Sequence, residues 1–99
     1  MKRGGVVYIM ASNNRRVLYT GVTSDLVSRM KQHKEKFFPK SFTSRYNCYV
    51  LVYYRSFRTI EEAILEEKRI KGGNRRAKEK LISATNPAWA DLSLEIENW

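Results

Sequence analysis

The sequence predicts an α+β domain built on a small antiparallel sheet of about three strands, flanked by helices in the order ββαβαα. Three observations support this prediction. Two segments rich in β-branched and aromatic residues, 5–11 and 16–22, lie on either side of a polar stretch typical of a turn. A third segment of this kind covers residues 49–57. Helix start and stop signals then divide residues 59–84 into two helices.

The first two strand segments are expected to pair as a hairpin, because asparagine in the turn between them tolerates positive φ. If the turn is centred on Asn13 and Asn14, Tyr8 lies directly opposite Tyr19, on the same exposed face of the sheet. Aromatic cross-strand pairs commonly do no more than stabilise a sheet, so this pair alone does not indicate chemistry. The same register pairs Met10 with Val17 and Val6 with Gly21.

A first helix is expected to begin with Thr23 or Ser24 as its cap and to run to about Lys34. Leu26, Val27 and Met30 form its apolar stripe, and Asp25, Arg29 and His33 form the adjacent stripe. Arg29 and His33 could therefore belong to a solvated helix face.

Two further helices follow the last strand. Thr59 to Glu62 form a capping box that opens a helix to about Lys71, and Gly72-Gly73 ends it. Asn74 can cap the next helix, which runs to about Ala84. Residues 1–99 are expected to form a single domain, with 87–99 as a tail that packs back onto the body.

The charge of the chain indicates its partner. Nineteen Lys and Arg against ten Asp and Glu give a net charge of +9, and residues 1–86 alone carry +12. A compact domain with this imbalance attracts polyanions, of which nucleic acid is the most common in the cytoplasm. One His and one Cys exclude zinc sites of the His/Cys type. The single Cys48 and the lack of a long apolar run indicate a cytoplasmic protein without a membrane span.

Glu67 stands out on the second-last helix. Ile60, Ala63, Ile64 and Ile70 mark one apolar face at helical spacing, and Glu67 falls in its middle, whereas Glu61, Glu62 and Glu66 fall elsewhere. A carboxylate on a buried stripe is costly unless it is paired, protonated or bound to a cation. Three interpretations stay open: a buried ion pair with one of the arginines, an edge position from which the carboxylate reaches water, or a ligand of Mg²⁺ or Mn²⁺.

Together these features resemble the GIY-YIG endonuclease superfamily. Val6-Val7-Tyr8 and Tyr19-Thr20-Gly21 correspond to the Gly-Ile-Tyr and Tyr-Ile-Gly strands of that family. Arg29 and His33 match its first helix, and Ala63 with Glu67 matches its metal-binding helix. The resemblance is closest to small stand-alone bacterial members of the YhbQ type, which share Ile70-Lys71, the basic last helix and the stretch from Pro87 to Leu92. Many members carry a further Asn or Lys, for which Asn74 and Asn86 are the candidates here.

The resemblance implies a metal-dependent endonuclease that hydrolyses phosphodiester bonds in nucleic acid. DNA is the expected substrate, and the sequence leaves RNA open. One tyrosine, Tyr8 or Tyr19, would activate water, Arg29 would neutralise charge on the phosphate, and His33 would orient the phosphate or relay a proton. Glu67 would hold a single Mg²⁺ or Mn²⁺ ion, although Glu66 lies next to it. A protein partner could supply specificity. Phosphate contacts are expected from Lys34, Lys36, Lys40, Arg45, Arg75, Arg76, Lys78 and Lys80, and base stacking from Phe37, Phe38, Phe42 or Tyr46.

The alternative is a nucleic-acid-binding module that keeps this fold without cutting. It shares the charge, the aromatic residues and the hairpin, but it does not need a carboxylate on the apolar face of a helix.

Overall fold

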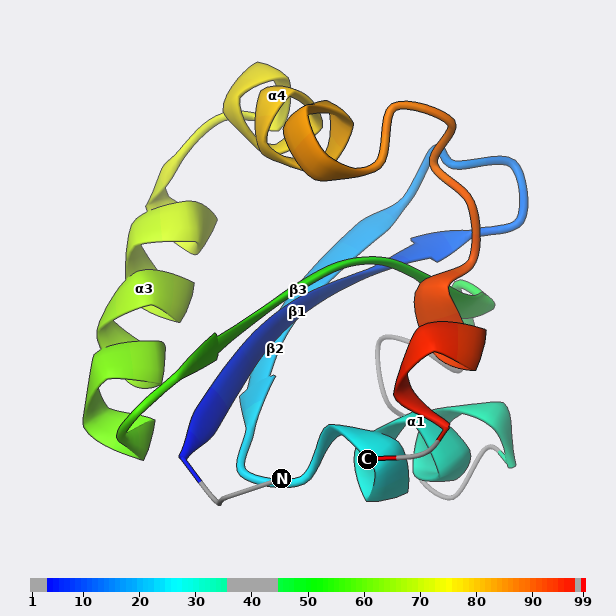
Figure 1. Ribbon diagram of the computed structural model, residues 1–99. Coiled ribbons are helices and arrows are strands. Elements are labelled where there is room, and N and C mark those ends of the chain that lie inside the picture. Colours follow the sequence, from blue (N-terminus) through cyan, green and yellow to red (C-terminus); the bar gives the residue numbers. More distant parts are fainter. Residues whose placement is uncertain (1–3, 36–44, 98) are drawn as a thin grey trace.

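The structure, a computed structural model, describes residues 4–35, 45–97 and 99 (Figure 1). Its elements confirm the predicted order and fold class. The three strands form one antiparallel sheet in the order β2-β1-β3, so that β1 lies in the centre and β2 and β3 form the edges. The elements are β1 (Gly5–Ser12), β2 (Leu18–Thr23), α1 (Leu26–Lys34), β3 (Cys48–Phe57), α3 (Ile60–Gly72), α4 (Arg75–Thr85) and the 3-10 helix η1 (Leu92–Ile96).

The two faces of the sheet bury two separate clusters, because successive side chains of a strand point to opposite sides. Val7 and Ile9 of β1 pack with Ala63 and Ile70 of α3 on one face, where Ile82 of α4 completes the cluster. On the other face, Tyr8 and Met10 pack with Leu26 and Met30 of α1 and with Ile96 of η1. Every residue of β1 is therefore buried, and α3 and α1 lie on opposite sides of the sheet (Figure 1).

The hairpin register differs from the prediction by two residues. Tyr8 faces Gly21, and Met10 faces Tyr19, so the two tyrosines are diagonal rather than direct neighbours. The reason is a turn centred one residue later, in which the Ser12 N–H donates to the Val17 carbonyl at 3.0 Å and Arg15 adopts a φ of 61°. A four-residue loop therefore replaces the expected two-residue one. Because the shift is even, both tyrosines stay on the same face.

The helix caps follow the sequence signals in two of three cases. Thr59 accepts from the Glu62 N–H and Asn74 accepts from the Ala77 N–H, as predicted for α3 and α4. The prediction for α1 was wrong, since Asp25 is the cap and accepts from the Ser28 N–H. Thr23 pairs with Val6 as the last residue of β2, so it cannot begin the helix.

The tail is held against β3 by one buried side chain and by side-chain hydrogen bonds. Ile96 is only 2% exposed, and the Asp91 carboxylate accepts from the Leu51 N–H of β3 at 3.3 Å. Asn86, which precedes the tail, donates to the Val52 carbonyl at 3.1 Å and to the Ala90 carbonyl at 2.9 Å. Asn86 thus has a structural role. Among the described residues, no helix has the length and apolar character needed to cross a membrane.

Candidate active site

Two tyrosines and the histidine gather on the α1 side of the sheet. The ring centroids of Tyr8 and Tyr19 are 6.3 Å apart. The centroid of the His33 ring lies 6.0 Å from that of Tyr8 and 6.1 Å from that of Tyr19. The Tyr8 hydroxyl lies 3.3 Å from Nε2 of His33. Residues from β1, β2 and α1 therefore meet at one point.

Gly21 allows the Tyr8 ring to reach this point. It is the residue that faces Tyr8 across the hairpin, and a β-carbon there would lie 2.5 Å from the Tyr8 hydroxyl oxygen and 3.0 Å from Cε2 of Tyr19. The Tyr8 side chain thus crosses the space above Gly21 towards the β2 edge. Sequence reasoning assigned this glycine no function beyond its place in the Tyr-Thr-Gly match, and the close approach depends on the register.

The burial of the cluster corrects one expectation. Tyr8 and His33 are 0% and 8% exposed, so they do not lie on an exposed face, because α1 and η1 cover that side of the sheet. Tyr19 and Arg29 are half-buried. Since Tyr19 belongs to an edge strand and is half-buried, the β2 edge is the side on which the cluster reaches solvent.

The electrostatics of the cluster keep Tyr8 protonated and His33 neutral near pH 7. Burial raises the pKa of the Tyr8 hydroxyl well above its usual range, and Tyr19 adds to this, whereas the Arg29 guanidinium lowers it. Burial and then the charge of Arg29 lower the pKa of His33. A neutral imidazole can accept the Tyr8 hydroxyl proton at Nε2. Arg29 interacts with both groups, so it belongs to the same cluster.

The two adjacent carboxylates of α3 are both largely covered. The side chain of Glu67 is 14% exposed and pairs with Lys71 at 2.9 Å. The side chain of Glu66 is 12% exposed and binds the Arg69 guanidinium through both oxygens, at 2.7 and 2.6 Å. The coverage of Glu66 comes from Arg69 and Arg55 rather than from the apolar stripe, so the helical pattern did not predict it.

Helical geometry assigns the two carboxylates to different edges of the sheet. Ala63 and Ile70 mark the line along which α3 contacts the sheet, and Glu66 and Glu67 lie on opposite sides of that line at 3.6 residues per turn. Glu66 pairs with Arg55 of β3 and so faces the β3 edge. Glu67 therefore faces the β2 edge, where α3 also packs, from the sheet face opposite to Tyr19.

Comparison with known proteins identifies the family. The model of the GIY-YIG catalytic domain matches residues 4–80 of the chain. The chain belongs to the GIY-YIG family. It is similar to the solution NMR structure of a UPF0213 protein from Bacillus halodurans, with a TM-score of 0.57 and 27% identity, over 96% of this chain and 98% of that chain. No curated protein shows significant similarity to it.

Membership of the GIY-YIG family implies a nuclease-type activity on nucleic acid, and nucleases of this family generally depend on a divalent metal ion. Within residues 4–35, 45–97 and 99, no three His, Cys, Asp or Glu side chains gather in a way that could hold a metal ion. Glu67 nevertheless fits a single-carboxylate site, because Mg²⁺ keeps several waters and takes phosphate oxygens as further ligands. Its present partner, Lys71, is half-exposed and flexible, so the ion pair can be exchanged.

The basic residues of this GIY-YIG protein divide into those that hold the fold and those that face solvent. Arg75 donates to the carbonyls of Arg15 and Arg16 and pairs with Glu79, so its guanidinium ties α4 to the hairpin turn. Lys78 donates to the Gly73 carbonyl at 2.8 Å. The solvent-exposed candidates are Lys34, Arg45, Arg76 and Lys80, with Tyr46 exposed as well. Lys36, Phe37, Phe38, Lys40 and Phe42 lie outside the described residues.

Proposed function

We propose that this protein is a metal-dependent endonuclease that hydrolyses phosphodiester bonds, with DNA as its preferred substrate. The observation that supports it best is the cluster of Tyr8, Tyr19, Arg29 and His33 at the β2 edge of a GIY-YIG domain. A module that only binds nucleic acid does not need two phenols, an imidazole and a guanidinium in mutual contact. The single buried Cys48 agrees with the cytoplasm as its location.

Burial supports Tyr19, rather than Tyr8, as the group that contacts the attacking water. Tyr19 is half-buried on the edge strand, whereas Tyr8 is fully covered and holds its proton tightly. In our mechanism the water gives a proton to the Tyr19 oxygen as its own oxygen bonds to phosphorus. Tyr19 passes its proton to Tyr8, and Tyr8 passes its own to Nε2 of His33. The P–O ester bond breaks, the leaving oxygen takes a proton from solvent, and His33 releases its extra proton to solvent.

Arg29 and Glu67 complete the proposed site. The Arg29 guanidinium stabilises the phenolate character that develops on the tyrosines and can also donate to phosphate oxygens. Glu67 would hold the divalent ion, which supplies positive charge next to the phosphate. Helical geometry supports this role for Glu67 over Glu66, because Glu67 faces the β2 edge.

Replacing Glu67 by Gln tests the enzyme proposal. We expect Glu67→Gln to bind nucleic acid as before and to lose cleavage by orders of magnitude. Its free energy of unfolding should change by less than about 1 kcal/mol, because an ion pair with a half-exposed lysine contributes little. Cleavage of single-stranded, duplex and branched DNA and of RNA is measured with Mg²⁺, Mn²⁺ or EDTA, beside thermal melts with and without Mn²⁺.

Glu66→Gln is the matched control, since it changes the adjacent and equally covered carboxylate. It should retain kcat and lose stability together with the Arg69 and Arg55 pairs. If Glu66→Gln were inactive and Glu67→Gln active, the metal ligand would be misassigned. If the unaltered protein bound all of these substrates and cut none, the chain would be a binding module.

A further inference from the structure

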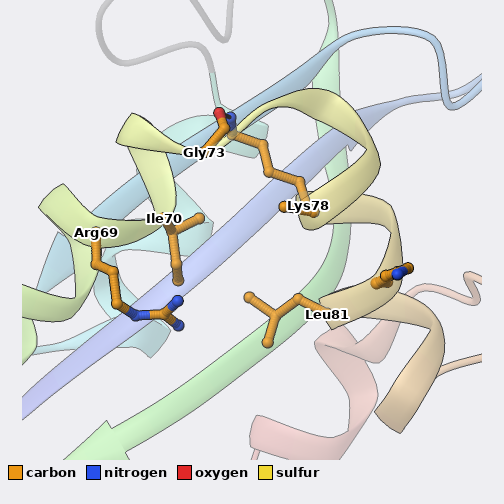
Figure 2. Close-up of a pocket in the computed structure, with 7 residues that line it drawn as sticks. Arg69, Ile70, Gly73, Lys78 and Leu81 are labelled. Carbon is orange, nitrogen blue, oxygen red and sulfur yellow. Dashed lines mark hydrogen bonds between the residues drawn. The ribbon is translucent and has the colours of Figure 1, made fainter.

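A cavity lies between α3 and α4, away from the tyrosine cluster. It has a volume of about 340 Å³. Figure 2 shows Arg69 and Ile70 of α3 and Leu81 of α4 around the same space. Ile70 belongs to the buried cluster on the α3 face of the sheet, whereas Tyr8 belongs to the cluster on the other face. The cavity is therefore separate from the proposed active site.

The lining combines an apolar surface with three positive charges. Ile70, Ala77 and Leu81 supply the apolar surface, and Arg69, Lys78 and Lys80 supply the charges. Among the residues that the structure describes, no acidic side chain lines it. A ligand that matches both properties carries an anionic group beside a compact apolar or aromatic group.

Glu66 orients the Arg69 guanidinium at the side of this cavity. Nε and Nη2 of Arg69 both donate to the Glu66 carboxylate, which keeps the guanidinium plane in one orientation. A guanidinium plane is a surface on which a nucleobase can stack. Since a guanidinium has five N–H donors, Arg69 can also donate to a ligand while it holds Glu66. The Glu66–Arg69 pair thus shapes the cavity.

Lys78 and Lys80 can bind a phosphate while α4 keeps its helical structure. Lys78 donates one hydrogen bond to the Gly73 carbonyl, and an ammonium group has two further donors. Lys80 is exposed, so its flexible side chain can move towards an anion.

We infer that this cavity binds one nucleotide, with its base against Ile70, Ala77 and Leu81 and its phosphate on Lys78, Lys80 and Arg69. The volume is near the lower end of ligand cavities, roughly 300–1,000 Å³, which suits one nucleotide rather than a stretch of strand. The nucleotide is either free or an unstacked residue of a nucleic-acid strand, whose base can lie between apolar side chains. The strand form rests on the proposed function, and the free form does not.

Binding is tested on the whole protein in EDTA, so that no cleavage takes place. Thymidine 5′-monophosphate, thymidine, inorganic phosphate, a short oligodeoxythymidylate and the same strand with abasic sites are titrated by calorimetry. The nucleotide, free or within the strand, should bind at least about tenfold more tightly than its base-free counterpart, as expected when an apolar contact adds to a charge-assisted one. Equal affinity for phosphate and nucleotide, and for the two strands, would overturn the inference.

Ala77→Leu fills the cavity from an exposed helix position, and Ala84→Leu makes the same change on α4 outside the cavity. The first should weaken nucleotide binding about tenfold or more and the second should leave it unchanged. Glu66→Gln should also weaken nucleotide binding, because the Arg69 guanidinium is then no longer held in one orientation. Equal nucleotide binding by Ala77→Leu and Ala84→Leu contradicts the inference.

Cleavage assays separate this inference from the proposed function. With a cleavable strand, Ala77→Leu should raise KM and leave kcat unchanged. Tyr19→Phe should lose cleavage and keep nucleotide binding. A protein that binds the nucleotide in this cavity but cuts nothing refutes the proposed function alone, and a protein that cuts but shows no Ala77→Leu effect on binding refutes the inference alone.

Discussion

At the scale of single residues, Gly21 determines whether Tyr8 can reach Tyr19 and His33. A β-carbon there would lie 2.6 Å from Cζ of Tyr8, so Gly21→Ala must displace the ring. We expect the variant to lose about 1–3 kcal/mol of unfolding free energy, as in other overpacked cores, and to lose most of its cleavage activity. Urea melts and a cleavage assay measure both.

Gly72→Ala is the control for this change. Gly72 lies in α3 with no neighbouring atom within 4 Å of a β-carbon, so alanine should stabilise the helix by about 0.5–1 kcal/mol and leave cleavage unchanged. Equal stability and activity of Gly21→Ala and the unaltered protein would mean that Tyr8 does not cross above Gly21.

His33 makes stability depend on pH in a defined direction. Its pKa is lowered in the folded protein, so below the unfolded pKa of about 6.5 the unfolded chain binds a proton that the folded chain resists. Stability from this group is present above that pH and is lost as the pH falls. We expect the urea midpoint to decrease from pH 7.5 to pH 5.5.

His33→Gln should flatten this dependence, because the chain has no other histidine. The lowered pKa values of Glu66 and Asp91 affect stability at more acidic pH, as carboxyl groups do, and do not interfere. A slope that survives in His33→Gln would show that another group titrates in this range.

At the scale of elements, Arg75 connects α4 to the β1–β2 hairpin. Its guanidinium donates to the Arg15 carbonyl at 2.7 Å and to that of Arg16, across most of the length of the chain. Arg75→Gln should therefore reduce the free energy of unfolding by about 1 kcal/mol or more. Arg76→Gln, at the exposed adjacent position, should change stability by less than about 0.5 kcal/mol and weaken nucleic-acid binding. Equal losses of stability in Arg75→Gln and Arg76→Gln would show that the hydrogen bonds from Arg75 to the hairpin do not stabilise the protein.

Capping signals in the sequence predicted where a helix begins when no contact from elsewhere in the chain used the same residue. Thr59 and Asn74 cap their helices because a cap needs only its own side chain and the first helical turn. Thr23 fails as a cap because β2 uses it in strand pairing, which is a tertiary contact. The turn at Arg15 shifted the register for a local reason: the Ser12 hydroxyl accepts from the Val17 N–H and closes a longer loop.

At the scale of the whole molecule, the net charge of +9 governs association with nucleic acid. Affinity should fall steeply as salt rises, because each neutralised phosphate adds roughly 0.7–0.9 to the log–log slope. Fluorescence anisotropy with a labelled duplex at several salt concentrations measures this slope. A nearly flat dependence would contradict binding through phosphate contacts.

The sequence by itself determined the fold class and the family, and it predicted which residues form the site. Periodicity and capping are local, and the residues that resemble the family motifs are Tyr8, Tyr19, Arg29, His33 and Glu67. Tertiary structure decided how each of them can act. Tyr8 is buried because α1 and η1 both cover its face, and Tyr19 stays accessible because β2 is an edge strand. Glu66 and Glu67 are equally covered, and only the position of α3 over the sheet directs them to different edges. Burial and direction depend on residues far apart in the chain, which no local pattern contains.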